Sequence, residues 1–269
     1  MKSNNSQLSI IGGGVMAEAI LSRLLAQQVF AGSAVLVSEP RVERRNFLAQ
    51  KYQVQVTADN QAAISTTEIL LLAVKPQVFK SVTANITPNK NSLVISILAG
   101  VTIDKLEQAF PQQPVIRVMP NTPATVGMGM TAIAPGTYAQ PKHIQQAKDI
   151  FNAVGEVVEV PESSMDAVTG LSGSGPAFVA LAIEALADGG VASGLPRAIA
   201  LQLATQTVLG TATLIKEKGM HPGVLKDQVT SPGGTTIAGV AKLESLGLRS
   251  ALIEAVKTAT ARSQELGRS

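Results

Sequence analysis

The sequence has no cysteine and no tryptophan, and aromatic residues make up only 3% of it. Without cysteine the chain can form no disulfide, no thiol nucleophile and no thiolate metal site. The two histidines, His143 and His221, are too few for a multi-histidine metal centre, so we expect no metal. The scarcity of aromatic residues leaves Ala, Val, Leu and Ile to build the core.

Long runs of charge and unbroken apolar runs are also missing. The net charge is +3, and the densest basic stretch, 41–45, is interrupted by Glu43. This balance suits anionic small molecules and does not indicate nucleic acid binding. The longest apolar stretch, 178–195, is broken by Glu184, Asp188 and several glycines, so we expect no membrane span. The polar N-terminus is unlike a signal peptide, and we expect a cytoplasmic location.

The first half of the sequence alternates apolar runs with helical stretches. With 269 residues, 45% of them apolar and 15% charged, the chain has a globular composition with room for two domains. The alternation predicts an α/β fold with a mostly parallel, doubly wound sheet of the Rossmann type. The expected strands are 8–11, 34–37, 54–56, 68–74, 93–97 and 115–118, and the first expected helices are 16–28 and 42–51.

The second half predicts helices almost alone. We therefore divide the chain into a dinucleotide-binding domain, 1–161, and a helical domain, 162–269. The expected helices are 178–187, 197–218, 235–245 and 249–266, and Gly219 is a typical helix end.

Two of these helices, 178–187 and 197–215, are apolar on nearly all sides, which is typical of buried helices. A small helical domain cannot easily bury that much surface by itself. We infer that it packs against a second copy, as a homodimer or a larger homo-oligomer. The alternative is a helical core that the first domain covers.

A glycine-rich motif, G-x-G-x-x-A, follows the first strand and opens the first helix at 12–17. Gly12 permits the tight turn, Gly14 lets the backbone approach a pyrophosphate, and Ala17 lets the helix lie close to the strand. The phosphates would sit at the helix N-terminus, where free N–H groups favour anions. A glycine turn without a ligand is the alternative.

The residues after the second strand bear on the choice between NAD and NADP. NAD enzymes place an acidic residue here for the ribose 2′-hydroxyl, whereas NADP enzymes use small polar and arginine residues for the 2′-phosphate. Ser38 and Arg41 fit NADP, and Glu39 points the other way. Arg44 and Arg45 either assist or form a solvated helix face. On balance these residues favour NADP.

Further loops are expected at the carboxyl ends of strands, where a doubly wound sheet binds its ligand. They are 73–76, 98–100 and 119–123, and prolines stiffen two of them or simply end the strands. Lys75 either contacts the cofactor or caps a strand end. In the helical half, 231–236 combines glycines and threonines at a helix start, which suits either a carboxylate pocket or a plain helix cap.

These segments resemble one known family. Residues 165–190, 194–197, 221–223 and 231–236 are closely similar to the pyrroline-5-carboxylate reductases, and the Ser-Pro-Gly-Gly-x-Thr segment is quite specific to that family. Upstream, 73–76 and 119–123 look like its cofactor and active-site loops, so the resemblance runs along essentially the whole chain. It implies a Rossmann domain followed by an all-α dimerisation domain. It also implies reduction of 1-pyrroline-5-carboxylate to L-proline, with NADPH preferred and NADH possible.

The resemblance also implies residue roles. Thr236 would hydrogen-bond the ring nitrogen and is the catalytic candidate, although water could supply the proton. Thr235, where some members carry Ala, and Leu98, where some carry a smaller residue, are departures. The substrate would be bound by Asn121, Glu162, Ser231, Gly233, Gly234, Thr235 and Thr236. The cofactor would be bound by Gly12, Gly13, Gly14, Val15, Met16, Ala17, Ser38, Arg41, Asn60, Ala73, Val74, Lys75, Pro76, Ile97, Leu98 and Ala99.

Two other functions remain to be distinguished. A β-hydroxyacid dehydrogenase also has a Rossmann domain followed by helices, but it uses a lysine on a helix after a glycine-rich segment. No lysine lies between Lys148 and Lys216 to fill that role. A non-catalytic module that senses NADP would bind the dinucleotide without turning over an imine.

Overall fold

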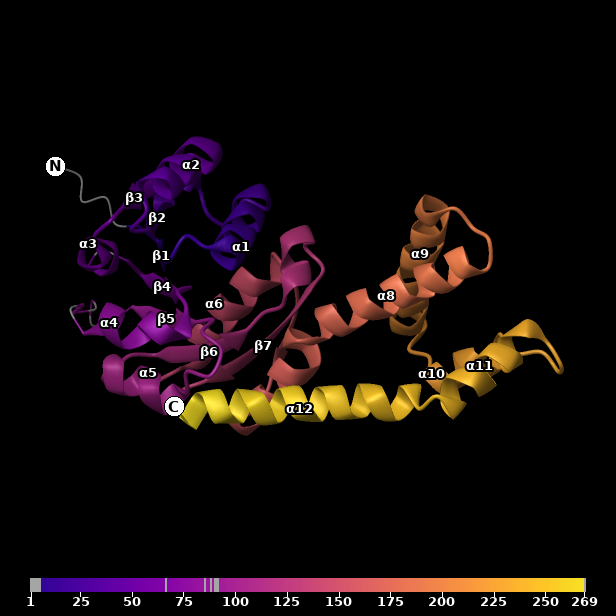
Figure 1. Ribbon diagram of the computed structural model, residues 1–269. Helices are drawn as coiled ribbons and strands as arrows, with labels where there is room; N and C mark the ends of the chain where they lie inside the picture. Colours follow the sequence, from indigo (N-terminus) through magenta and orange to yellow (C-terminus); the bar gives the residue numbers. More distant parts are fainter. Residues whose placement is uncertain (1–5, 66, 85, 88, 90–91, 269) are drawn as a thin grey trace. The chain divides into compact units, whose positions relative to one another are not determined.

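The structure is a computed structural model that describes residues 6–65, 67–84, 86–87, 89 and 92–268 (Figure 1). These residues fall into two compact units. The first comprises the described parts of Met1–Gly173 and Thr258–Ser269, and the second is Ser174–Lys257.

The described residues of the first unit form an eight-stranded sheet with the order β3-β2-β1-β4-β5-β6-β7-β8. All neighbouring strands are parallel except β6 and β7, which are antiparallel. The mostly parallel, doubly wound sheet predicted from the sequence is confirmed. The strands are β1 Leu8–Ile11, β2 Val35–Ser38, β3 Gln55–Thr57, β4 Ile69–Leu72, β5 Leu93–Ser96, β6 Val115–Met119, β7 Gly129–Pro135 and β8 Gly155–Glu159.

The central strands are mostly apolar and buried because helices cover both faces of the sheet. Successive side chains point to opposite faces, so Ile10 and Ile11 of β1 enter different core clusters. Leu71 and Leu72 of β4 divide in the same way. The helices and short turns of this part are α1 Val15–Ala26, η1 Gly32–Ala34, α2 Val42–Tyr52, α3 Asn60–Ile64, η2 Pro76–Val78, α4 Phe79–Thr83, α5 Ile103–Ala109, η3 Thr122–Val126 and α6 Pro141–Asn152.

The sheet continues beyond the strands expected from the sequence, through β7 and β8. The helix α6 connects these two strands. Gly129 and Gly155 face each other where the two strands begin to pair. Gly155 has φ +151°, and a Cβ added to it would lie 1.9 Å from the carbonyl oxygen of Gly129. The strand pair therefore depends on glycine at 155.

Residues 162–173 lie in the first unit as η4 Glu162–Ser164, α7 Met165–Val168 and the π-helical turn Thr169–Gly173. The end of α12, Leu248–Arg268, lies in the same unit. Two hydrogen bonds attach it, from Ser263 Oγ to Asp166 Oδ1 (2.7 Å) and from Lys105 Nζ to the carbonyl of Gly267 (2.9 Å). The domain division at 161–162 stays a prediction.

The second unit consists of helices. They are α8 Gly175–Ala192, α9 Arg197–Lys218, α10 Pro222–Gln228 and α11 Thr235–Ser245, followed by the first part of α12. The helix α9 has the bounds expected from the sequence, and Gly219 ends it in the left-handed conformation. Small side chains, Ala187, Ala200 and Ala204, form the contact between α8 and α9.

The remaining apolar side chains of α8 and α9 are largely exposed. Leu181 is 65% and Leu186 is 54% exposed. By length and composition alone, the helical stretches Glu162–Ala192 and Arg197–Lys218 could cross a membrane, contrary to the sequence-based expectation, although the core helix of a soluble protein passes the same test. In the second unit, taken by itself, these side chains form an exposed apolar surface of the kind that marks an interaction site.

Candidate functional site

The turn between β1 and α1 has the shape that the glycine motif predicts. Gly12 has φ +101°, and a Cβ added to it would lie 2.7 Å from the carbonyl oxygen of Ala73. Its N–H donates to the carbonyl of Ser38 over 2.8 Å. Only glycine combines this backbone angle with so close a neighbour. The turn is thereby held against the ends of β2 and β4.

The start of α1 presents N–H groups to open space. Gly14 is the N-cap and has no side-chain cap, and no atom lies within 4 Å of a Cβ added to it. The first helical bond runs from the N–H of Glu18 to the carbonyl of Gly14. The N–H groups of Gly14, Val15 and Met16 are therefore oriented for an anion. Ala17 is 3% exposed and packs in the core, as its place in the motif requires.

Glu39, directly after β2, is buried and held by internal donors. Its Oε2 accepts from the N–H of Gly13 (3.0 Å), and its Oε1 accepts from Nε (2.9 Å) and the main-chain N–H (3.2 Å) of Arg41. Burial alone would raise the pKa of Glu39, but the bonds from Arg41 and Gly13 outweigh it and lower the pKa below the usual 4.5. This ionised carboxylate is already engaged on both oxygens.

The other residues expected near the adenosine end lie around Glu39. Ser38 is 1% exposed, and its hydroxyl donates to Oδ1 of Asn60 over 2.6 Å. Asn60 is half-buried at the start of α3. The side chain of Arg41 is 70% exposed, so its guanidinium borders solvent while Nε holds Glu39. Arg41 is thus open to a ligand phosphate, whereas Ser38 lies behind Asn60.

The loop after β4 lies beside the glycine turn. The N–H of Ala73 donates to the carbonyl of Ile11 (2.9 Å), and Val74 packs against a core cluster. Lys75 is exposed and Pro76 is half-buried where η2 begins. The predicted loop is therefore formed in the structure.

The loop after β5 offers mainly its backbone. Ile97 and Ala99 are half-buried, but Leu98 is only 2% exposed and points into the core. Because its side chain is buried, Leu98 could meet a ligand only through its main chain.

Asn121, which follows β6, forms hydrogen bonds within the first unit through both its amide oxygen and its amide nitrogen. Its Oδ1 accepts from the N–H of Met130 (2.9 Å), and its Nδ2 donates to the carbonyl of Ser172 (3.1 Å). The side chain therefore joins the loop after β6 to β7 and to the π-helical turn.

The side chain of Glu162, in η4, contacts the start of α5. Its Oε1 accepts from the N–H of Ile103 (2.6 Å) and from Nη1 of Arg117 (3.1 Å). The side chain of Arg117 is only 6% exposed, and its Nη2 lies 4.0 Å from Oδ1 of Asp166. Sequence reasoning missed Arg117, although a charged residue inside the apolar strand Val115–Met119 is the kind of signal that marks a buried ion pair.

Arg117 also borders a cavity of about 290 Å³ in the first unit. The cavity is lined by Gly100, Thr102, Arg117, Asp166, Gln264 and Gly267. The loop after β5 and the end of α12 thus share a polar recess beside Glu162.

The turn 231–236 belongs to the second unit. Gly233 has φ +68°, and the N–H of Gly234 donates to the carbonyl of Ser231 over 3.1 Å. Gly234 is the N-cap of α11 without a side-chain cap, so the first N–H groups of the helix are available. Ser231 and Thr235 are exposed and Thr236 is half-buried. The turn has the geometry of a small anion site with hydroxyl groups beside it.

Two family models match this chain, one in its C-terminal part and one in its N-terminal part. Residues 162–266 match the family model described as pyrroline-5-carboxylate reductase dimerisation. Residues 7–100 match the model described as NADP oxidoreductase, coenzyme F420-dependent.

Proteins that match this chain over nearly their whole length include pyrroline-5-carboxylate reductases. The chain is 63% identical to a pyrroline-5-carboxylate reductase of Synechocystis, over 97% of this chain and 98% of the relative. A solved pyrroline-5-carboxylate reductase from Coxiella burnetii superposes with a TM-score of 0.90 at 34% identity, covering 99% of this chain and 100% of the other. The Plasmodium falciparum pyrroline carboxylate reductase with NADP bound gives a TM-score of 0.89 at 31% identity, covering 98% and 99% of the two chains.

Proposed function

Because the chain belongs to the pyrroline-5-carboxylate reductase family, we propose that it reduces 1-pyrroline-5-carboxylate to L-proline with a nicotinamide dinucleotide as the reductant. The observation that carries this proposal is the similarity to proteins of that name along nearly the whole chain. The glycine turn with its open N–H groups supports it at the level of chemistry.

The direct test follows the absorbance of reduced nicotinamide while the protein, NADPH and the cyclic imine react. We expect oxidation of NADPH that depends on the imine and forms proline. Binding of NADPH without turnover would instead support a sensing module. Turnover of a β-hydroxyacid, with none of the imine, would support the dehydrogenase alternative.

We propose that the cofactor pyrophosphate binds at the N–H groups of Gly14, Val15 and Met16. Bound NADPH supplies a hydride to the substrate. The first unit would bind the rest of the cofactor through the remaining residues of the turn, the end of β2 with Asn60, and the loops 73–76 and 97–99. The contribution of Leu98 would come from its main chain, since its side chain is buried.

We propose that NADPH is preferred over NADH. Glu39 already accepts three hydrogen bonds from Gly13 and Arg41, which leaves it little capacity for a ribose 2′-hydroxyl. Arg41 compensates the charge of Glu39 and keeps an exposed guanidinium that suits a 2′-phosphate. We expect Arg41→Ala to lower kcat/KM for NADPH by about tenfold and to leave the value for NADH nearly unchanged. An equal loss with both cofactors would refute this role.

We propose that the N–H groups at the start of α11 bind the substrate carboxylate. Ser231, Gly233, Gly234 and Thr235 would shape this site, and the hydroxyl of Thr236 would hydrogen-bond the ring nitrogen. The imine carbon accepts the hydride, and the nitrogen retains the proton that makes the imine electrophilic. Thr236 would hold that nitrogen and its proton in position.

Thr236→Ala should lower kcat clearly while NADPH binding stays near normal, and Thr236→Ser should recover part of the loss because it keeps the hydroxyl. Unchanged kinetics in the Ala variant would remove Thr236 from the mechanism.

Asn121 would reach the substrate through its second Nδ2 hydrogen, and Glu162 would reach it through Oε2. Internal hydrogen bonds occupy the other polar atoms of these two side chains.

We propose that a second copy of the chain covers the apolar surface of α8 and α9. The exposure of Leu181 and Leu186, together with the match to a dimerisation model, supports this. Light scattering should give at least twice the 27.8 kDa mass of one chain, and Leu181→Glu should shift the mass towards one chain. A cytoplasmic location goes with this proposal. Sedimentation with membranes, reversed only by detergent, would contradict both.

A further inference from the structure

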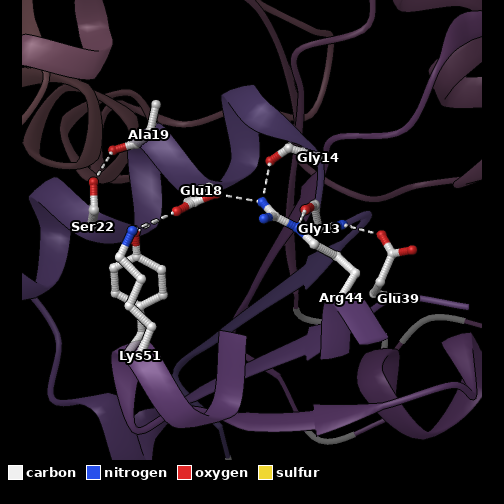
Figure 2. A network of polar contacts seen from close by, with 9 residues as sticks. Gly13, Gly14, Glu18, Ala19, Ser22, Glu39, Arg44 and Lys51 are labelled. Carbon is white, nitrogen blue, oxygen red and sulfur yellow. Dashed lines mark hydrogen bonds and ion pairs between the residues drawn. The ribbon is translucent and has the colours of Figure 1, made fainter. Parts of the chain in front are cut away.

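Arg44 of α2 lies directly against the glycine turn. Figure 2 shows its guanidinium between Gly13, Gly14 and Glu18. The Nε donates to the carbonyl of Gly13 over 2.6 Å, and Nη2 lies 3.5 Å from the carbonyl of Gly14. The side chain is 20% exposed. Arg44 is therefore mostly enclosed, and its hydrogen bonds go to the glycine turn and to Glu18.

The contact with the carbonyl of Gly13 fixes the peptide that Gly13 shares with Gly14. In a trans peptide the C=O and the following N–H point in opposite directions. A guanidinium that holds the carbonyl of Gly13 on the α2 side therefore turns the N–H of Gly14 to the other side. The backbone of Gly14 is open to a ligand, since a Cβ added to it would meet no atom within 4 Å beyond its neighbours in the chain.

This N–H matters because the others of the glycine turn are already used. The N–H of Gly12 donates to Ser38 and that of Gly13 donates to Glu39. Of the three glycine N–H groups, the one at Gly14 is left to begin the anion site together with the first turn of α1.

Arg44 also compensates a negative charge beside the same site. Glu18, in the first turn of α1, accepts from Nη2 of Arg44 (2.5 Å), from Nζ of Lys51 (3.0 Å) and from the hydroxyl of Tyr52 (2.6 Å). Burial alone would raise its pKa, but the bonds from Tyr52, Arg44 and Lys51 lower the pKa to about 2. Lys51 shares this carboxylate with Arg44, whereas the bonds to the turn come from Arg44 (Figure 2).

We infer that Arg44 is a positioning residue that orients the Gly13–Gly14 peptide for the pyrophosphate common to NADPH and NADH. This inference rests on the proposed function only in taking the turn as the dinucleotide site. It deepens that proposal by assigning Arg44 to the diphosphate linkage and not to the 2′-phosphate.

The test compares Arg44→Gln, Arg44→Lys and Lys51→Gln with the unaltered protein, each titrated with NADPH and with NADH. Lys51→Gln is the matched control, because it removes the same charge and a partner of the same Glu18. We expect Arg44→Gln to raise Kd by about tenfold for both dinucleotides, by similar factors, whereas Lys51→Gln changes either Kd less than about twofold. In turnover, KM for NADPH should rise with Kd while kcat at saturation stays within about twofold.

Three results would overturn the inference. A loss confined to NADPH would make Arg44 a ligand of the 2′-phosphate. An equal loss in Lys51→Gln would trace the effect to the charge of Glu18. Unchanged binding in Arg44→Gln would leave the turn independent of Arg44.

Arg44→Lys decides the case if Arg44→Gln does not fold. A lysine keeps the charge beside Glu18 but lacks the fork of parallel donors that reaches the turn, so both Kd values should rise several-fold. Unchanged values would refute the inference. Because the titrations need no imine, a protein that binds both dinucleotides but never forms proline would refute the proposed function and leave the role of Arg44 standing.

Discussion

Two glycines of the same turn should respond in opposite ways to the same substitution. Gly12 and Gly14 are two positions apart, but Gly12 has φ +101° and a close backbone neighbour, whereas Gly14 has φ −71° and open space around it. Gly12→Ala should therefore damage the fold, and Gly14→Ala should damage dinucleotide binding.

The magnitudes follow from the geometry. At Gly12 a methyl group would meet the carbonyl oxygen of Ala73 at 2.7 Å, in a backbone conformation that alanine rarely adopts. Backbone strain costs about 1–3 kcal/mol and the steric overlap adds about 1–3 kcal/mol. The midpoint of thermal unfolding should fall by roughly 5–15 °C.

Gly14→Ala keeps an allowed conformation, so the midpoint should change by less than about 3 °C. The new methyl would occupy the space through which a pyrophosphate approaches the backbone. A steric cost of about 1–3 kcal/mol corresponds to an affinity for NADPH that is about 5- to 150-fold weaker.

The assay combines thermal unfolding without ligand and titration with NADPH. The reasoning about the turn would be refuted if Gly14→Ala unfolded as early as Gly12→Ala. Normal binding of NADPH by Gly14→Ala would refute the placement of the pyrophosphate.

Further predictions concern stability. Gly155→Ala should cost at least about 3 kcal/mol of unfolding free energy, because its Cβ would overlap Gly129 at 1.9 Å; a normal denaturation midpoint would contradict this. The pKa of Glu18 is lowered from 4.5 to about 2. Ionised Glu18 therefore contributes about 1 kcal/mol, after solvent screening, to the free energy of unfolding. This contribution is complete above pH 4.5 and is lost as the pH falls through about 2. The stability difference between the unaltered protein and Glu18→Gln, from urea unfolding, should therefore shrink between pH 5 and pH 2. Burial, and then the charge of Lys142, lower the pKa of His143 below 6.5. The contribution of neutral His143 to the free energy of unfolding should therefore be complete above that pH and decline below it. Tm measurements should find this decline absent in His143→Gln.

The strands and helices that the sequence predicts well are those whose pattern is continuous. The runs at 8–11, 69–72 and 93–96 are buried on both faces and are almost entirely apolar, with Ser9 and Ser96 as the polar residues. By contrast, β8 is half exposed at the sheet edge, and its sequence Gly-Glu-Val-Val-Glu has no such run. Its pairing depends on glycines at 129 and 155, which are far apart in sequence. Local pattern cannot report such a contact.

The site shows the same division between local and distant information. The glycine motif is local, and its turn forms as expected. Glu39 seemed to favour NAD because its donor, the N–H of Gly13, lies 26 positions away. The direction of Arg44 depends on the packing of α2 beside the turn, so the sequence left open whether it assists the cofactor or faces solvent. The roles of the turn 231–236 stay predictions.

The hydrogen bond between Glu39 and Gly13 has a consequence for protein engineering. An engineer who wished to switch the coenzyme would ordinarily exchange the acidic residue after the second strand. In this chain that exchange would remove the hydrogen bond that Glu39 accepts from Gly13, and it would destabilise the glycine turn that binds either coenzyme. Redesign of coenzyme choice should therefore spare Glu39 and begin at the exposed side chain of Arg41, because the N–H of Gly13 and the main-chain N–H of Arg41 would still bind Glu39 after the guanidinium is replaced.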